Sequence, residues 1–166
     1  MDNLNLRGMT FNHVNAGFVL GTTKSITTTA TTVCSIGGVF ATGLTALTNS
    51  ATVPTTDAAT GLAFPKLTDN QATVLVFGVN AAGAIQLCQG SIEPTAVGIT
   101  TTAGAFINGP QFPALPDDFC PIAYGLVRTA PSAADWTAGT DNWTATGVTC
   151  SVFKNVAVLP ARPQIV

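Results

Sequence analysis

Residues 72–90 read ATVLVFGVNAAGAIQLCQG, in which two apolar runs flank a turn-like NAAG. The side chains of a strand alternate between its two faces, and in the first run both sets are largely apolar. This run is therefore predicted to be a strand that is covered on both faces. The two sets are Val74 and Val76 on one face, and Thr73, Leu75, Phe77 and Val79 on the other.

The second run predicts the returning strand of a hairpin. In IQLCQ at 85–89, Ile85 and Leu87 alternate with Gln86 and Cys88, so one face is expected to be wetter. Gly83 supplies the positive φ that a short hairpin loop needs. We interpret residues 72–90 as a β-hairpin at the centre of an all-β domain.

The composition favours strands and a surface that lies against other proteins. Only 8% of the 166 residues are charged and 46% are hydrophobic, whereas about 25% are charged in ordinary domains. The 27 threonines fit a pleated sheet and are poor helix formers. A monomer with so few charges tends to associate; a neutral, Thr-rich surface that stays soluble is the alternative. One domain is expected for this length, large enough to bury a core without a metal or a disulfide.

The charge pattern argues against nucleic-acid and membrane partners. The net charge is −2 and the six basic residues are scattered, whereas nucleic-acid binding needs Lys and Arg to replace counterions on the phosphates. No stretch reaches the roughly 18 consecutive apolar residues of a membrane span. The first 21 residues lack the basic-then-apolar order of a signal peptide, so assembly in a reducing host cytoplasm is expected.

The four cysteines are predicted to be free thiols. Cys34, Cys88, Cys120 and Cys150 form no CxxC pair, so a zinc site has no support. Three disulfide pairings are formally possible. Each cysteine lies in or beside an apolar run, however, where a free Cys behaves as a small buried hydrophobe.

Three parts are predicted along the chain: an extended N-terminal arm at 1–21, an antiparallel β-sandwich or jelly-roll-like domain at 22–155, and an extended C-terminal tail at 156–166. Many short strands separated by turn signals favour a sandwich. The tail contains two prolines and is polyproline-like. Strands are expected at 18–20, 25–36, 39–41 (after the Gly37-Gly38 turn), within 43–71, and at 105–108, 122–129 and 147–158, with a weak helix signal at 42–47.

Enzyme signatures are sparse. His13 is the only histidine, and a lone His among Asn and Val is more often a surface or packing residue. Asp117-Asp118 is the only acidic pair; paired carboxylates can act as acid and base, but a turn after Leu115-Pro116 explains them better. The two glycine-rich phosphate-binding patterns, G-x-x-x-x-G-K-[ST] and G-x-G-x-x-G, are both absent from the sequence. No catalytic, metal-ligating or cofactor-binding residue is predicted, and no cofactor is expected.

The two tryptophans are weighed as a sugar site, because exposed indoles can stack on sugar rings. The spacing of seven between Trp136 and Trp143 does not place both on one face of a continuous strand. A Trp in a small β domain more often belongs to a core or an interface. The sequence Asn142-Trp143-Thr144 matches the glycosylation pattern, and without a signal peptide we interpret the match as chance.

From residue 112 onward the sequence resembles a known class of proteins. FPALPDDFCPIAYGLVRT at 112–129, followed by DWTAGTDNWTATGVTCSVFKNV at 135–156, is similar to structural proteins of tailed bacteriophages. In those proteins a Pro-rich passage leads into a strand, an aromatic-T-x-G-T turn and a closing strand, and a hairpin similar to VFGVNAAGAIQLCQGS precedes it. The resemblance covers about half of the chain, 73–155. It implies a capsid decoration, cement or head-fibre-type protein that is β-rich and a homotrimer.

The function expected from these observations is structural. The chain is predicted to be a non-enzymatic protein of the virion that binds the major capsid protein on the outer surface of the shell and stabilises it. One alternative is a receptor- or glycan-binding fibre or tail module, and another is a small β-sandwich hydrolase. In the favoured hypothesis the domain clamps junctions between capsid proteins with an extended terminus as the strap. Alternatively, both termini fold back on their own domain.

Two sets of residues follow from this interpretation. The predicted partner-binding residues are Phe11, Val14, Phe18, Leu20, Trp136, Trp143, Ile165 and Val166. The predicted core residues are Val74, Val76, Phe77, Ile85, Leu87, Ile122, Tyr124, Leu126, Val152 and Phe153.

Overall fold

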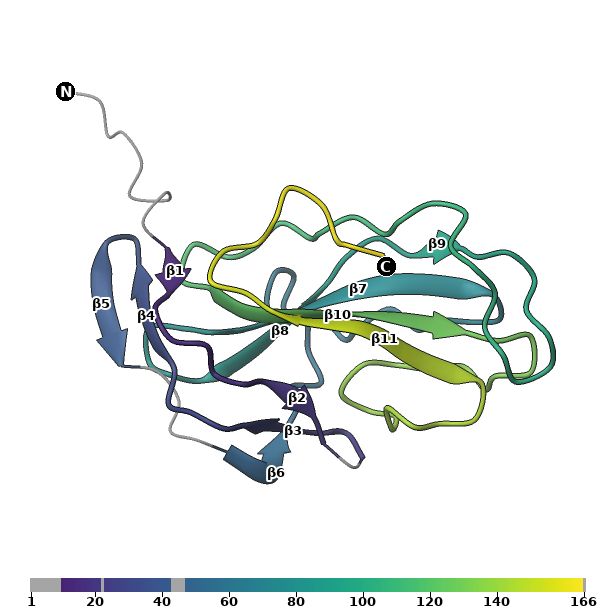
Figure 1. The fold of residues 1–166 in the computed structure, drawn as a ribbon, viewed down its shortest axis with the longest axis horizontal. Helices are drawn as coiled ribbons and strands as arrows, with labels where there is room; N and C mark the ends of the chain where they lie inside the picture. Colours follow the sequence, from purple (N-terminus) through teal and green to yellow (C-terminus); the bar gives the residue numbers. More distant parts are fainter. Residues whose placement is uncertain (1–9, 22, 43–46, 166) are drawn as a thin grey trace.

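The part of the chain that the structure describes consists of strands and irregular connections, with no helix (Figure 1). The computed structural model describes residues 10–21, 23–42 and 47–165, and of residues 42, 47–52 and 152 it describes the backbone only. The strands are β1 (Phe11–Asn12), β2 (Val19–Leu20), β3 (Ser25–Thr28), β4 (Val33–Ile36), β5 (Val39–Thr42), β6 (Leu47–Thr52), β7 (Gln71–Val79), β8 (Ile85–Gln89), β9 (Glu93–Pro94), β10 (Cys120–Thr129) and β11 (Val148–Asn155).

The predicted hairpin lies in a five-stranded antiparallel sheet. The strand order is β11-β10-β7-β8, and β9 pairs with the start of β7. Phe77 of β7 pairs with Leu87 of β8 on one side and with Ala123 of β10 on the other. Strand β7 therefore pairs with three of the other four strands of this sheet, and β10 joins β11 to it.

The turn between β7 and β8 is held by its own asparagine. The Asn80 side-chain oxygen accepts the backbone N–H groups of Ala82 and Ala84 at 3.1 and 2.9 Å. Gly83 has a φ of 76°, which a residue with a Cβ adopts only at a cost. The hairpin prediction is confirmed, including the role of Gly83.

Two smaller antiparallel sheets come from the N-terminal third of the chain. One has the order β1-β4-β5 and the other β2-β3-β6. Strands β4 and β5 are joined by Gly37 and Gly38, which have φ values of 57° and 81°. Two successive residues with positive φ form a tight hairpin turn whose twist matches that of the strands. The hairpin predicted at Gly37-Gly38 is confirmed.

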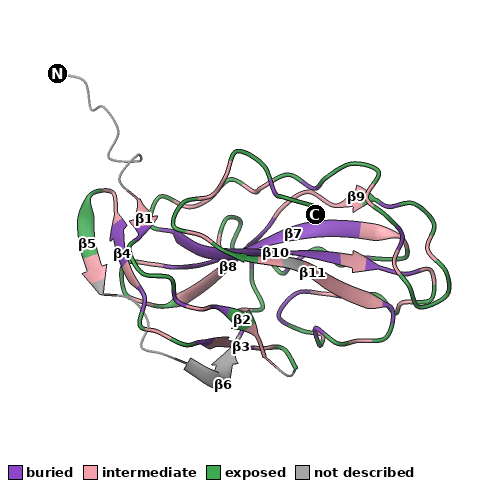
Figure 2. Ribbon diagram, viewed as in Figure 1, coloured by how far each residue is buried: buried purple, intermediate pink, exposed green. Residues whose placement is uncertain are grey.

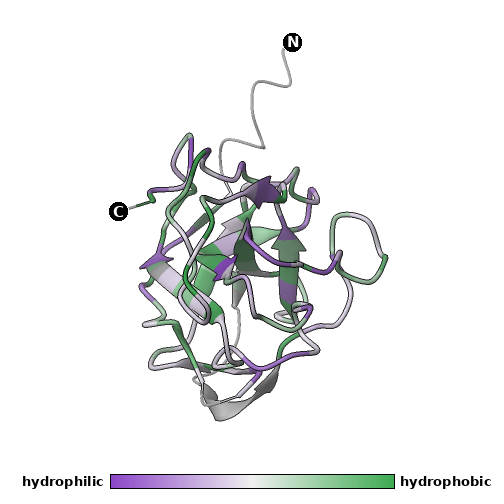
Figure 3. Ribbon diagram, turned by 90° about the vertical axis from the view of Figure 1, so that its right-hand side faces the viewer, coloured by the Kyte–Doolittle hydropathy of each residue, from purple (hydrophilic) through white to green (hydrophobic). Residues whose placement is uncertain are grey.

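Strand β7 is covered on both faces, as its sequence predicts. On one face, Leu75, Phe77 and Val79 pack in a cluster with residues from the N-terminal sheets and both tryptophans. On the other face, Val74 and Val76 pack in a second cluster with side chains from the segment 106–119 and the C-terminal tail. Figure 2 shows β7 buried along most of its length, and Figure 3 shows hydrophobic strands surrounded by loops of mixed hydropathy.

Most of the predicted core is buried. Val74, Val76, Phe77, Leu87, Ile122, Tyr124 and Leu126 are at most 1% exposed. Ile85 and Phe153 are half-buried and pack against the first cluster. The side chain of Val152 lies outside the described residues.

The termini lie against the domain instead of extending from it. Of the predicted arm, residues 10–21 contribute β1 and β2, which pair with β4 and β3; residues 1–9 lie outside the described part. In the tail, Val156 donates its N–H to the Ile122 carbonyl at 3.0 Å, and Pro163 is buried. Over the described residues, the alternative in which both ends fold back is the one that the structure supports.

The all-β antiparallel class is confirmed, whereas a jelly-roll-like sandwich is not. One face of the main sheet is covered by two small sheets, and the other by irregular, proline-rich segments. The strand expected at 105–108 is only a single bridge between Phe106 and Thr95. A strand does lie within 43–71, namely β6, and the weak helix signal at 42–47 falls largely on residues outside the description.

Candidate functional site

Phe18, which was expected to bind a partner, belongs to the core. Its ring is fully buried and lies 4.7 Å from the ring of Phe77 and 5.2 Å from that of Phe153, measured between centroids. The side chain of Asn155 bonds to both the N–H and the carbonyl of Phe18, at 2.7 and 3.0 Å. Phe18 therefore joins the N-terminal segment to the main sheet and is not available to a partner.

Both tryptophans are also core residues. Trp136 and Trp143 are 1% and 4% exposed, and their rings lie 5.6 Å apart. Each indole N–H donates to a backbone carbonyl at 3.0 Å, Trp136 to Asn142 and Trp143 to Ser25. The prediction that they contact a partner is wrong for this chain on its own, because neither ring has a free face to offer a sugar or a protein.

The remaining predicted partner residues have mixed positions. Phe11 is half-buried in β1, and Leu20 is half-buried against the first cluster. Val14 and Ile165 are exposed to 37% and 39%. Val166 lies outside the described residues.

The residues weighed for catalysis have structural contacts. His13 Nε2 lies 2.8 Å from the Ser35 hydroxyl, and its ring lies against those of Phe11 and Phe40. A nucleophile–base pair also needs a third group that orients the base. The two rings against His13, those of Phe11 and Phe40, have no hydrogen-bond acceptor that could orient it. Asp117 and Asp118 are exposed in a turn closed by the Phe119 N–H on the Pro116 carbonyl, as the turn interpretation predicts. Among the described residues, no group of three His, Cys, Asp or Glu is placed to hold a metal.

The four cysteines are free thiols whose environment suppresses reactivity. Burial, together with the nearby charge of Asp57, raises the pKa of Cys88 to about 12. Burial alone raises the pKa of Cys150 to about 12. Burial also raises the pKa of Cys34 and of Cys120. Because the thiolate is the reactive form, these thiols stay protonated and inert in the folded protein at neutral pH.

Alkylation is expected to distinguish the folded from the unfolded chain. Without a reductant, the native protein at neutral pH should remain largely unmodified, and the denatured protein should gain four adducts. Intact-mass spectrometry measures both. Fewer than four adducts after denaturation would reveal a disulfide and would contradict the expectation of a reducing compartment.

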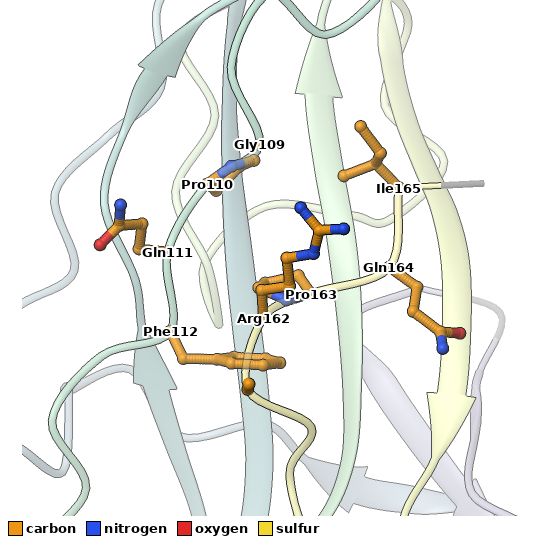
Figure 4. A pocket seen from close by; sticks show the side chains of 9 residues that line it. Gly109, Pro110, Gln111, Phe112, Arg162, Pro163, Gln164 and Ile165 are labelled. Carbon is orange, nitrogen blue, oxygen red and sulfur yellow. The ribbon is translucent and has the colours of Figure 1, made fainter.

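A groove lies between the segment 109–112 and the C-terminal tail at 161–165 (Figure 4). Its volume is about 870 Å³. The Phe112 ring lies across one end, edge-on to Tyr124 at 5.1 Å, and Arg162 extends between the two segments. The lining offers one cation, Arg162, and the amides of Gln111 and Gln164, with no carboxyl, thiol or imidazole side chain. The groove can hold an extended chain, but its lining supplies no acid–base chemistry.

The two most exposed aliphatic side chains among the described residues lie in the loop 95–107, which we name the apolar tip. Val97, Ile99 and Ile107 are 81%, 79% and 62% exposed. Large exposed aliphatic side chains in one loop make this loop a candidate interaction surface. In the sequence, Val97 and Ile99 are only short apolar patches after Pro94, and their exposure is a property of the folded structure.

Backbone bonds fix the shape of the apolar tip. Ile99 and Thr102 exchange N–H···O bonds of 3.0 and 2.7 Å, and the Ala96 N–H donates to the Ala105 carbonyl. The two halves of the tip approach closely: a Cβ added at Gly104 would lie 1.8 Å from the Ala96 oxygen. Thr100 sits at the turn with a φ of 48°, a conformation that is uncommon for residues other than Gly, Asn and Asp.

Residues from three other segments hold the apolar tip on the domain. Asn70 accepts the Gly98 N–H at 3.1 Å, and Arg128 donates to the Gly104 carbonyl at 2.8 Å. The Arg128 guanidinium also lies 4.8 Å from the centre of the Phe106 ring. Ser132 bonds to the Thr100 carbonyl through its backbone N–H at 3.1 Å. The tip therefore presents its apolar side chains from a fixed backbone.

Within the part of the chain that the structure describes, no helix is long and apolar enough to cross a membrane. Comparison with protein families, with characterised proteins and with solved structures finds no match to this chain.

Proposed function

We propose that this chain is a non-enzymatic structural protein of a tailed-bacteriophage virion, bound to the major capsid protein on the outer surface of the shell, which it stabilises. The observation that carries the proposal is the apolar tip, a rigid loop that exposes Val97, Ile99 and Ile107. The resemblance of 73–155 to capsid decoration proteins and the charged fraction of 8% support it. Self-association on the shell is part of the proposal, and the homotrimer that the resemblance implies stays a prediction of its stoichiometry.

The tip suits a role that consists of binding alone. Burying an aliphatic side chain stabilises a contact by roughly 1.5–3 kcal/mol, so three such side chains supply a useful but modest affinity. Because the tip is held by hydrogen bonds before it binds, little conformational entropy is lost on docking. Many copies that bind a repeating shell add avidity to each weak contact. A shell covered in this way should resist heat and osmotic shock better than a bare one.

Charging the tip is expected to remove the protein from the shell without unfolding it. The double variant Val97→Asp/Ile99→Asp would place two carboxylates where the proposal expects an apolar contact. Both positions are largely exposed, so the free energy of unfolding should change by only about 0.5 kcal/mol per site. The occupancy of the variant on purified shells that lack the protein, measured by quantitative gel or cryo-EM, should fall at least tenfold.

A matched control distinguishes this specific contact from non-specific hydrophobic binding to the shell. Leu62 is 69% exposed and lies outside the tip, so Leu62→Asp should bind shells as the wild type does. If the wild type does not bind shells, the proposed function is wrong. If the wild type and the double variant bind equally well, the tip is not the contact.

A further inference from the structure

The outer edge of β5 lies at the end of the molecule where β1, β4 and β5 lie (Figure 1), and it is an outer edge of its sheet among the described residues. Val39 and Phe40 are 70% and 63% exposed, and Figure 2 shows this part of β5 as exposed. Strand β5 pairs with β4 and, among the described residues, with no other strand.

The hairpin geometry shows which backbone groups of β5 face outward. Across a two-residue turn the flanking residues, Ile36 and Val39, exchange both backbone bonds, and bonded and non-bonded pairs then alternate. The pairs Ser35–Phe40 and Val33–Thr42 are therefore non-bonded.

A bond on the other side of β4 agrees with this alternation. The Val33 carbonyl accepts the His13 N–H at 2.7 Å, so it points away from β5. The N–H and C=O groups of Phe40 and Thr42 consequently point to the free edge. An edge with free groups at alternate residues is a template for another strand.

This edge lacks the devices by which proteins keep strand edges apart. Natural edges carry charged side chains, prolines or bulges. No Asp, Glu, Lys, Arg or His lies between Lys24 and Asp57, and β5 contains no proline and pairs with β4 in unbroken register. A groove of about 470 Å³ beside the hairpin is lined only by apolar residues, namely Ile36, Val39, Phe40, Ala41 and Ala81.

We propose that the β5 edge binds the β5 edge of a second copy of this chain, antiparallel and across a two-fold axis at Phe40. This register brings the outward groups of Phe40 onto those of its copy and joins two three-stranded sheets into one of six strands. It places each Val39 opposite the small Ala41 of the other copy. All pairs in the register come from residues 38–42.

The chemistry of the edge favours a second copy as the occupant. An isologous contact needs a surface that is complementary to itself. The β5 edge meets this condition, because its outward groups recur at the same spacing in both copies and no like charges oppose each other. Large and small side chains alternate across the axis, and cross-strand aromatic pairs such as Phe40 with its copy stabilise sheets.

The contact is small, so self-association should depend on concentration. Four-residue strands bury far less than the roughly 1,200 Å² of a stable complex. Dimers should therefore form at high protein concentration or where copies are crowded on a surface. The contact belongs to the isolated chain and is tested without shells, so its failure is distinct from failure of the proposed function.

Sedimentation equilibrium over micromolar to millimolar concentrations tests the edge. The wild type should approach twice the mass of the chain, whereas Phe40→Asp should stay at the monomer mass. Leu62→Asp, which alters an equally exposed residue outside the edge, should behave as the wild type. Phe40→Thr keeps a strand-forming residue without adding charge and should weaken dimerisation at least fivefold; circular dichroism confirms that each variant is folded.

A cysteine at the axis tests the register. Directly opposite residues in a bonded pair have Cα atoms about 5.5 Å apart, within the roughly 4.4–6.8 Å of disulfides. With oxidised glutathione as the electron acceptor, Phe40→Cys should form a covalent dimer, while Val39→Cys, which faces Ala41 of the copy, and the wild type should not. A wild type that stays monomeric, an oligomer that Phe40→Asp leaves intact, or equal cross-linking at positions 39 and 40 would overturn the proposal.

Discussion

Phe77→Ala is expected to lower the free energy of unfolding by about 3–5 kcal/mol, the usual cost of removing a large buried aromatic side chain. Phe77 is 1% exposed in the middle of β7. Its ring centroid lies 4.7 Å from that of Phe18, 5.5 Å from that of Phe153 and 6.1 Å from that of Trp143.

The surroundings of Phe77 explain why the cost should be near the upper end of this range. The cost of a truncation depends on how well the site can collapse. Phe77 and Phe153 are fixed by the main sheet. Phe18 is fixed by its bonds to Asn155, and Trp143 is fixed by its bond to the Ser25 carbonyl. Rings that are anchored in separate elements cannot easily move into the space that Phe77 leaves.

Denaturant unfolding followed by fluorescence measures the effect, because Trp143 reports on the same cluster. Leu62→Ala is the matched control, since Leu62 is 69% exposed and surface substitutions usually stay within about 0.5 kcal/mol. A loss below about 1 kcal/mol for Phe77→Ala would show that this cluster is not the main core.

The central hairpin was predictable because its determinants are local. Alternation over 73–79 places apolar residues on both faces whatever the neighbours are, and the structure buries both faces. Gly83 and the Gly37-Gly38 pair likewise mark turns by their own conformational freedom. A local pattern of this kind needs no knowledge of what packs against it.

The role of the N-terminal segment was not predictable in the same way. Phe18 is held by Asn155, 137 positions away, and no periodicity near Phe18 signals that contact. Residues 11–20 mix Asn, Gly and apolar residues, and such a sequence is equally compatible with a free arm and with two short strands. Only the tertiary pairing of β1 with β4 and β2 with β3 decides between them.

Exposure of apolar residues was the other feature that the sequence did not reveal. Val97 and Ile99 resemble core residues by type, and Trp136 and Trp143 resemble binding residues, yet the structure exposes the first pair and buries the second. The backbone of the tip is fixed in this position by hydrogen bonds from Asn70, Arg128 and Ser132, which lie far from it in the sequence. Candidate contact residues therefore had to be found from burial and bonding in the fold.

Deleting residues 156–166 is expected to destabilise the domain by about 3 kcal/mol or more, because the tail covers one face of the main sheet. Val156 and Leu159 pack on the cluster that contains Val74, Val76 and Tyr124. Removal of the tail would expose several of these side chains, and each one that becomes fully exposed would lower the free energy of unfolding by roughly 1.5–3 kcal/mol. The ordering entropy that the tail no longer loses offsets part of this cost.

Two smaller changes test whether the tail acts through this packing. Removing only residues 165 and 166 should change the free energy of unfolding by about 0.5 kcal/mol or less, because Ile165 is 39% exposed. Tyr124→Phe should cost about 1 kcal/mol, since the Tyr124 hydroxyl accepts the Gln164 N–H at 3.2 Å. Thermal and denaturant unfolding of the three variants measures the series. A full deletion that is as stable as the wild type would show that the tail is free to leave the sheet, and would return it to the role of a strap for a neighbouring protein.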